Sequence, residues 1–141
     1  MEELIISVDP GREKCGVAVV HKTNGVHLKK IVSTANLSEA VAKLAEEYNT
    51  LTVVLGNRTT SRETKNILAK IVVNQRNLDV KLVDEHRSTD AARIRYWREN
   101  PPKGLKRLIP VTLQIPPTPV DDYVAVILAE RYFENTESEN L

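Results

Sequence analysis

The sequence predicts an α/β protein built on one five-stranded mixed sheet with helices on its faces. The first three apolar runs follow one another with no room for a helix, and Asn24-Gly25 between the second and third is a strong hairpin signal. The fourth and fifth runs each follow a segment in which apolar residues have helical spacing. Short links make neighbouring strands antiparallel and helical crossovers make them parallel, so the predicted strand order is 3-2-1-4-5, with strand 2 antiparallel to its neighbours. The predicted strands are 4–8, 16–22, 26–32, 51–55 and 80–83.

Capping boxes predict where the first two helices begin. Asn36 and Glu39 have the spacing of such a box ahead of an amphipathic segment, and Thr60 and Glu63 repeat it ahead of the next one. Each of these helices links two of the predicted strands. They are therefore expected to be the crossovers that keep the fourth and fifth strands parallel to the first.

The C-terminal half is predicted to contain two more helices. Ser88 or Thr89 is expected to cap the third helix. Residues 100–119 are rich in proline and are predicted to be a loop with one short helical piece. The last helix is predicted from about 120 to 133, and its apolar middle indicates a buried position. The polar tail from about residue 134 is expected to be disordered.

The composition predicts a single compact domain over residues 1–141, since a chain of this length is too short for two ordinary domains. Cys15 is the single cysteine, which excludes a disulfide framework or a thiolate metal cluster and favours a cytoplasmic location. No apolar run approaches the length of a membrane span, so no membrane partner is expected. The formal net charge of +1 means that any binding of nucleic acid must come from a local basic patch.

Acidic residues gather at the predicted carboxyl ends of the parallel strands. Asp9 follows the first strand, Asp84 and Glu85 follow the fifth, and Asp121 and Asp122 open the last helix. Ligands bind at these ends where an open sheet changes direction. Converging carboxylates repel one another unless a hard cation such as Mg²⁺ or Mn²⁺ lies between them. The pattern predicts a metal site, and a pair of ions about 4 Å apart there can promote phosphodiester cleavage.

Each of these carboxylates also has a simpler structural explanation. Asp9 is a favoured residue before a Pro-Gly turn, and the pair after the fifth strand is compatible with a solvated loop. Asp121 fits the third position of a helix, where backbone donors and the helix dipole stabilise an acidic side chain. Helical spacing places both Asp121 and Asp122 in rows with apolar residues, so geometry alone does not choose between them. Their joint position at one end of the sheet favours the metal site.

Basic residues predict a second functional surface. Six lie between Arg93 and Arg107, opposed only by Glu99, and Tyr96 and Trp97 among them offer rings for stacking on bases. A solvated helix face is the plainer explanation of such a run. The predicted nucleic-acid contacts are Arg58, Arg62, Arg87, Arg95, Arg98, Lys103, Lys106 and Arg107.

Three motifs, at 8–19, 83–92 and 120–133, resemble the YqgF/RuvX-type nucleases of the RNase H-like superfamily. These are relatives of Holliday-junction resolvases and are linked to maturation of pre-16S ribosomal RNA. The resemblance implies an RNase H-like fold and an endonuclease that depends on Mg²⁺ or Mn²⁺, with two ions expected. It also implies a DNA junction or an rRNA precursor as the partner, and a monomer or homodimer.

The resemblance also implies which carboxylates act. Aligning the last helix by Tyr132-Phe133 places the family's aspartate at Asp121. The implied catalytic residues and metal ligands are therefore Asp9, Glu85 and Asp121, and the secondary candidates are Asp84 and Asp122.

The chain departs from the family's pattern at three places, which suggests a divergent branch. Thr59-Thr60-Ser61-Arg62 replaces the family's glycine-containing loop. His86 separates the acidic pair from Arg87, and Gly56-Asn57-Arg58 stands where the family usually has Gly-Leu-Pro. Two other functions were weighed. One is a catalytically silent RNase H-like module that binds nucleic acid. The other, an actin/sugar-kinase-like ATPase, needs two lobes and a longer chain.

Overall fold

Five strands form one mixed sheet, and their order is the one that the sequence predicts. The computed structural model describes the backbone of residues 3–58 and 61–139, and the side chains of this range up to residue 136. The strands are β1 (Leu4–Asp9), β2 (Lys14–His21), β3 (Gly25–Ser33), β4 (Thr52–Gly56) and β7 (Asp79–Val83). Their order is β3-β2-β1-β4-β7. β2 is antiparallel to β1 and β3, whereas β1, β4 and β7 are parallel to one another.

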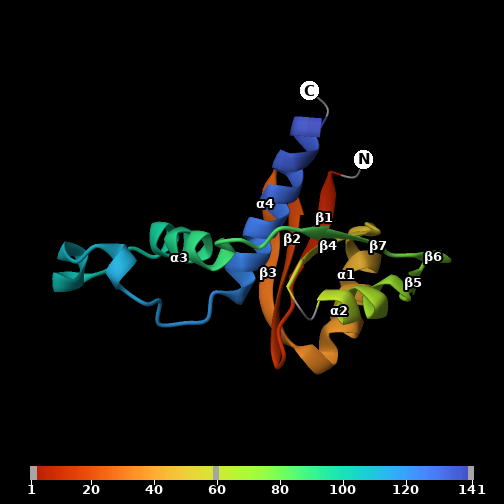
Figure 1. Cartoon of the computed structure of the whole chain (residues 1–141), viewed down its shortest axis with the longest axis horizontal. Coiled ribbons are helices and arrows are strands. Elements are labelled where there is room, and N and C mark those ends of the chain that lie inside the picture. The colour runs from red at the N-terminus through yellow and green to blue at the C-terminus, as the bar shows by residue number, and fades with distance from the viewer. Residues whose placement is uncertain (1–2, 59–60, 140–141) are drawn as a thin grey trace.

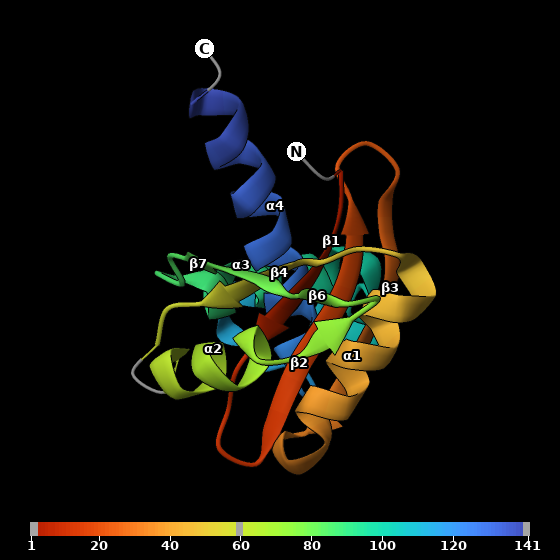
Figure 2. The ribbon, with the colours of Figure 1, turned by 90° about the vertical axis from the view of Figure 1, so that its right-hand side faces the viewer.

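Helices cover both faces of this sheet. α1 (Leu37–Tyr48) and α2 (Ser61–Ala69) lie on one face, while α4 (Asp121–Glu139) lies on the other with α3 (Ser88–Glu99) beside it, as Figures 1 and 2 show. The core is divided accordingly into two apolar clusters, one on each face. β1 and β2 are buried along nearly their whole length because both of their faces are covered. Among the described residues, no helix combines the length and the apolar character needed to cross a bilayer.

The expected cap of the first helix is wrong, and the expected cap of the second lies outside the described residues. Asn36 precedes α1, but its side chain makes no capping hydrogen bond, because a 3₁₀ turn at Thr34–Asn36 leads into the helix. Thr60, the other expected cap, lies outside the described residues, and α2 begins at Ser61. A small hairpin of β5 (Val72–Val73) and β6 (Arg76–Asn77) then connects α2 to β7. The sequence analysis missed this hairpin, since its turn contains no glycine.

The predicted cap of α3 is wrong. Arg87, in the left-handed conformation with φ 56°, precedes the helix, and Ser88 is its first residue. The backbone N–H of Ser88 donates to the carbonyl of Glu85, so the chain turns tightly here without a side-chain cap. α4 begins at Asp121 as expected, but it continues to Glu139, past residue 134, where the ordered helix was expected to end.

Residues 100–120 form an arm outside the two helical layers. It contains two short 3₁₀ turns, Gly104–Leu108 and Val111–Leu113, where one helical piece was expected. In Figure 1 the chain leaves the sheet along α3, turns, and returns to the start of α4. Several large apolar side chains on this arm are exposed, namely those of Leu105, Leu108, Ile109, Leu113 and Ile115.

Gly16 determines how closely α4 approaches the sheet. It lies in β2 opposite Asp9, and a Cβ atom at this position would overlap the backbone carbonyl of Asp121. Any larger residue would therefore move the first turn of α4 away from β2. Because residue 16 is glycine, the first turn of α4, with Asp121, can lie next to the end of β1.

We expect Gly16→Ala to lower the melting temperature by about 3–10 °C, because overpacking costs about 1–3 kcal/mol and each kcal/mol shifts the transition of a domain of this size by a few degrees. Thermal unfolding followed by circular dichroism measures this. Gly25→Ala is the control: its Cβ would meet nothing within 4 Å, and only its left-handed backbone, with φ 82°, opposes the change. An equal or larger loss in the control would contradict the packing explanation.

Candidate active site

Two buried carboxylates lie at one end of the sheet. Asp9 ends β1 and Glu85 follows β7, and their residues are only 4% and 8% exposed. Parallel strands bring their carboxyl ends to the same edge, so residues 76 positions apart in the chain meet here. The two side chains are close enough for each to alter the pKa of the other.

Residues at the end of β4 contact Glu85 and hold its backbone. A Cβ atom on Gly56 would overlap the carboxyl group of Glu85, so this side chain lies directly over the glycine. The side-chain oxygen of Asn57 accepts the backbone N–H of Glu85 at 3.2 Å, and the backbone N–H of Asn57 donates to Val83 at 3.1 Å. Sequence analysis found no role for Asn57, because nothing in its neighbours marks it.

Asp84, the neighbour of Glu85, points elsewhere. It is exposed, its Oδ1 accepts the backbone N–H of His86 at 3.0 Å, and its carbonyl accepts a hydrogen bond from Arg131. The geometry therefore places Glu85, and not Asp84, beside Asp9.

Arg58 approaches the buried pair from the solvent side. Its Nε lies 2.6 Å from Oε2 of Glu85, and its Nη1 lies 4.0 Å from Oδ1 of Asp9. The Arg58 side chain is 47% exposed, whereas the two carboxylates are almost fully buried. We predicted Arg58 as a contact for nucleic acid; in this structure it is an ion-pair partner of the acidic site.

The buried oxygens of the pair lack hydrogen-bond donors. Oδ1 of Asp9 and both carboxyl oxygens of Glu85 accept no hydrogen bond in the described part of the chain, since the close contact with Arg58 is an ion pair without hydrogen-bond alignment. Buried polar atoms are normally satisfied, so such exceptions need an explanation. Carboxylate oxygens are the ligands that Mg²⁺ and Mn²⁺ prefer. The donor set of Asp9 and Glu85 therefore fits a divalent cation.

The two aspartates that open α4 have different partners. Asp122 is held against β3: its Oδ2 accepts from Lys29 at 3.2 Å, and its Oδ1 accepts the N–H of Tyr123 at 2.9 Å. Asp121 pairs with Lys14 at 3.4 Å, and its charge reaches far enough to raise the pKa of Asp9. Of the two, Asp121 is thus the one whose charge reaches Asp9, although its side chain pairs with Lys14.

The predicted three-carboxylate convergence is incomplete. Within residues 3–58 and 61–136, no three His, Cys, Asp or Glu side chains come close enough together to hold a metal ion. Asp9 and Glu85 meet as expected, but Asp121 is turned toward Lys14. Lys14 and Lys29, on the neighbouring strands β2 and β3, are partners of these aspartates that no pattern in the sequence indicates.

Burial raises the pKa of Asp9 to about 7, and the neighbouring charges of Glu85 and Asp121 add to this while Arg58 opposes it. Burial likewise raises the pKa of Glu85, against the charge of Arg58. Removal from water is the largest cause of both shifts, and the like charge that adds to it comes from Glu85 for Asp9 and from Asp84 for Glu85. The pair is therefore costly to ionise fully, and a cation at this position would relieve that cost.

The predicted basic patch is not one surface. Arg95 donates to both carboxyl oxygens of Glu130 at 3.0 Å and so faces α4, with Arg98 in a groove on the same side. Lys103 and Lys106 line a separate groove below the arm, and Arg107 and Arg62 are exposed elsewhere. Because the side chains of a helix point in all directions, consecutive charges in the sequence do not share a face.

A groove of about 380 Å³ begins near the acidic site. It is lined by one side of α3, from Arg87 through Arg93 to Trp97, and by residues 111–115 of the arm. Arg87, the groove residue nearest to Glu85 in the sequence, follows it by two positions, and Asp90 adds one acidic side chain to the lining. Both cationic and aromatic side chains line it, which is the combination that single strands of nucleic acid require.

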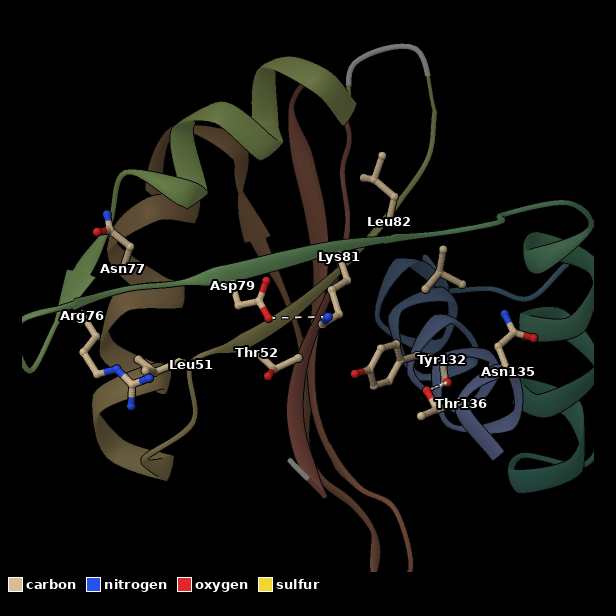
Figure 3. A pocket seen from close by; sticks show the side chains of 11 residues that line it. Leu51, Thr52, Arg76, Asn77, Asp79, Lys81, Leu82, Tyr132, Asn135 and Thr136 are labelled. Carbon is tan, nitrogen blue, oxygen red and sulfur yellow. Dashed lines mark hydrogen bonds and ion pairs between the residues drawn. The ribbon is translucent and has the colours of Figure 1, made fainter. Parts of the chain in front are cut away.

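A second groove, of about 680 Å³, lies away from the carboxylates. Figure 3 shows it between the exposed face of β7 and the C-terminal part of α4, with Lys81, Tyr132 and Thr136 among its lining residues. It includes Thr52 and Asp79, the first residues of β4 and β7, and thus lies toward the opposite end of these strands from Asp9 and Glu85. It contains no residue of the acidic site.

One family model and two solved structures are similar to this chain. The family model of the Tex protein YqgF-like domain matches residues 3–90, more than half of the chain. The structure of the Fowlpox virus resolvase with its substrate Holliday junction DNA is similar, with a TM-score of 0.60 and 18% identity over 94% of this chain and 98% of that one. A structure of the Fowlpox virus Holliday junction resolvase gives a TM-score of 0.54 and 18% identity, covering 94% and 99%. No curated protein sequence matches the chain. The expected RNase H-like fold is confirmed.

The raised pKa of Asp9 predicts a pH-dependent loss of stability in metal-free buffer. Folded Asp9 keeps its proton up to about pH 7, whereas the unfolded chain releases it near 3.8, so stability from this group falls as the pH rises from about 4 through 7. Asp9→Asn removes this dependence. We expect the variant to melt at least about 3 °C above the wild type at pH 8 and close to it at pH 5.

Melting in EDTA at the two pH values measures this difference. Asp84→Asn is the control, because Asp84 is exposed and its carboxylate is not buried beside another. A gain for Asp9→Asn that is the same at pH 5 and pH 8 would contradict the raised pKa.

Proposed function

Because the chain belongs to the family of the Tex protein YqgF-like domain, we propose that it is a divalent-metal-dependent endonuclease that hydrolyses phosphodiester bonds in structured nucleic acid. One observation carries the proposal. Asp9 and Glu85 are buried side by side at the carboxyl ends of two parallel strands, and three of their oxygens accept no hydrogen bond in the described residues. Their ion-pair partner, Arg58, approaches from the solvent side, so these buried oxygens are available to a cation.

Asp9 and Glu85 are the proposed ligands of Mg²⁺ or Mn²⁺, and Asp121 is the proposed third. The chemistry that such an ion, or a pair of ions, supplies is activation of a water and stabilisation of the leaving oxygen. The protein's own part is to fix the two carboxylates at the end of a rigid sheet. Lys14, which is half-exposed, is free to turn outward and release Asp121.

We propose a branched DNA junction as the first substrate to test and an rRNA precursor as the second. The Fowlpox virus resolvase acts on Holliday junction DNA and shares this fold. The groove along α3 supports a nucleic-acid path, since Arg87 and Arg93 suit phosphates and Trp97 suits a base. The arm that forms the other wall of the groove lies outside the helical layers of the sheet and would determine which nucleic-acid structure is accepted.

A catalytically silent nucleic-acid-binding module is the second candidate. Two observations favour it. Arg58 already neutralises Glu85, and no three ligand side chains converge among the described residues. A module of this kind would bind nucleic acid through the groove along α3 but would cleave nothing in any divalent cation.

Asp9→Asn and Glu85→Gln are expected to lower the cleavage rate at least about 100-fold, because each removes a charged ligand from the buried pair. The assay offers the purified protein a four-way DNA junction, duplex DNA and structured RNA in Mn²⁺. Asp84→Asn is the matched control and should cleave at the wild-type rate. If Asp9→Asn still cleaves, the assignment of the active site to Asp9 is rejected. If the wild type cleaves none of the three substrates, the catalytically silent module is favoured.

Asp121→Asn is expected to change Mn²⁺ affinity, whereas Asp122→Asn is expected to change the melting temperature. Asp121→Asn should weaken Mn²⁺ binding about tenfold or more with little effect on melting, since it loses a ligand but only a half-exposed ion pair. Asp122→Asn should lower the melting temperature by a few degrees and leave Mn²⁺ binding near wild type, because it loses its bond to Lys29. Calorimetry and thermal unfolding on both variants separate the two roles, and equal Mn²⁺ affinity in Asp121→Asn and wild type would reject Asp121 as a ligand.

A further inference from the structure

Arg58 is positioned where a metal ion would otherwise be expected. Its guanidinium reaches Glu85 at 2.6 Å and Asp9 at 4.0 Å, from the side on which the site opens to solvent. It follows β4 directly, and the neighbouring Asn57 fixes the backbone of Glu85, so the backbone around the contact is well held. The side chain itself is half-exposed and can turn outward without disturbing the core.

The other cations near this end of the sheet have separate partners. Lys14 pairs with Asp121 at 3.4 Å, and Lys29 pairs with Asp122 at 3.2 Å. Within the described residues, Arg58 is thus the cation that neutralises the buried pair. Without it, two carboxylates would lie side by side out of water with no opposite charge paired to them.

We propose that Arg58 is an internal counter-ion that competes with the divalent cation for Asp9 and Glu85, and that a phosphate of the nucleic acid draws it away. This inference rests on the proposed function. The guanidinium, 2.6 Å from Oε2 of Glu85, holds a positive charge where a cation bound by the two carboxylates would lie, so the two charges repel each other. A phosphate satisfies the fork of an arginine as well as a carboxylate does, so the guanidinium loses nothing by the exchange.

The consequence is coupling between the two ligands. When nucleic acid holds Arg58, the carboxylates are free for the cation, and when the cation is bound, Arg58 is free for the phosphate. Each ligand therefore raises the affinity for the other by the same factor. The buried pair stays neutralised when no substrate is present, and the divalent cation is favoured only when a phosphate is in place.

The first measurement is the affinity for Mn²⁺ without nucleic acid, by calorimetry, in wild type and Arg58→Gln. We expect the variant to bind Mn²⁺ about tenfold more tightly, because a competing charge is removed. Arg76→Gln is the matched control. It also removes one positive charge, but from β6 beside the groove of Figure 3, far from the carboxylates, and should leave the affinity unchanged. Unchanged or weaker Mn²⁺ binding by Arg58→Gln would overturn the proposal.

The second measurement is the coupling itself. A fluorescent four-way junction is titrated with protein in EDTA and in Ca²⁺, an ion that takes the same oxygen ligands as Mg²⁺. We expect Ca²⁺ to tighten junction binding at least about fivefold in wild type and to have no such effect in Arg58→Gln. Equal enhancement in both proteins would overturn the withdrawal of Arg58 by phosphate.

Arg58→Lys keeps the proposal testable if Arg58→Gln does not fold. Lysine retains the competing charge, so its Mn²⁺ affinity should stay close to wild type, and a tenfold gain would reject a counter-ion role. The outcome is also separable from that of the proposed function. If Mn²⁺ binding responds to Arg58→Gln as expected but no substrate is cut, the counter-ion stands and the nuclease activity does not. If neither the wild type nor Arg58→Gln binds Mn²⁺, the counter-ion role and the metal-dependent nuclease activity are both rejected.

Discussion

The burial of two like charges side by side constrains the rest of this structure. Asp9 and Glu85 are removed from water at the end of the sheet, and their mutual repulsion is opposed by the single guanidinium of Arg58. Such an arrangement survives only when the surrounding backbone is over-determined. Here it is: Gly56 leaves the space, Asn57 holds the backbone of Glu85, and the N–H of Ser88 closes the turn behind it. These contacts fix the carboxylates before any ligand arrives.

Close backbone approach at two glycines is what assembles the site from distant segments. Gly56 lets the carboxyl group of Glu85 lie on β4, and Gly16 lets the first turn of α4 lie on β2. The two contacts bring β7 and α4, which are far from β1 in sequence, to the same edge as Asp9. The lysines of β2 and β3 then hold the two aspartates of α4, in line with the favourable field at a helix N-terminus. The two glycines, which have no side chain, thus position the acidic residues as much as the ion pairs do.

Sequence patterns predicted the sheet well because its order follows from link lengths. Hairpin links and helical crossovers leave few arrangements, and the structure has the predicted one. Local details followed less closely. Asp84 and Glu85 are adjacent, so one faces each side of the chain, and only the space over Gly56 decides which is buried. The cap of α3 was missed because a left-handed Arg87 turns the chain without a side-chain bond.

The site residues themselves were predictable as a set but not as an arrangement. Carboxyl ends of parallel strands converge, which is enough to bring Asp9 and Glu85 together. The basic run between Arg93 and Arg107 was predicted as one surface, yet Arg95 is bound to Glu130 and Lys106 lies in a different groove. The partners of charged side chains depend on the direction of each residue from its helix, and this is fixed by tertiary packing that a linear pattern does not contain.

At position 58 the chain departs from the family pattern, and the residue there contacts the acidic site. A proline, which the resemblance would place here, brings no charge to the carboxylates and no hydrogen-bond donor. An arginine brings a cation that reaches both of them. The departure therefore changes the formal charge at the buried pair from −2 to −1. In the proposed counter-ion role, a site with this arginine binds a divalent ion more weakly in the absence of substrate than a site with proline does. The same substitution that makes the folded chain tolerate its buried carboxylates thereby makes its affinity for metal depend on what else is bound.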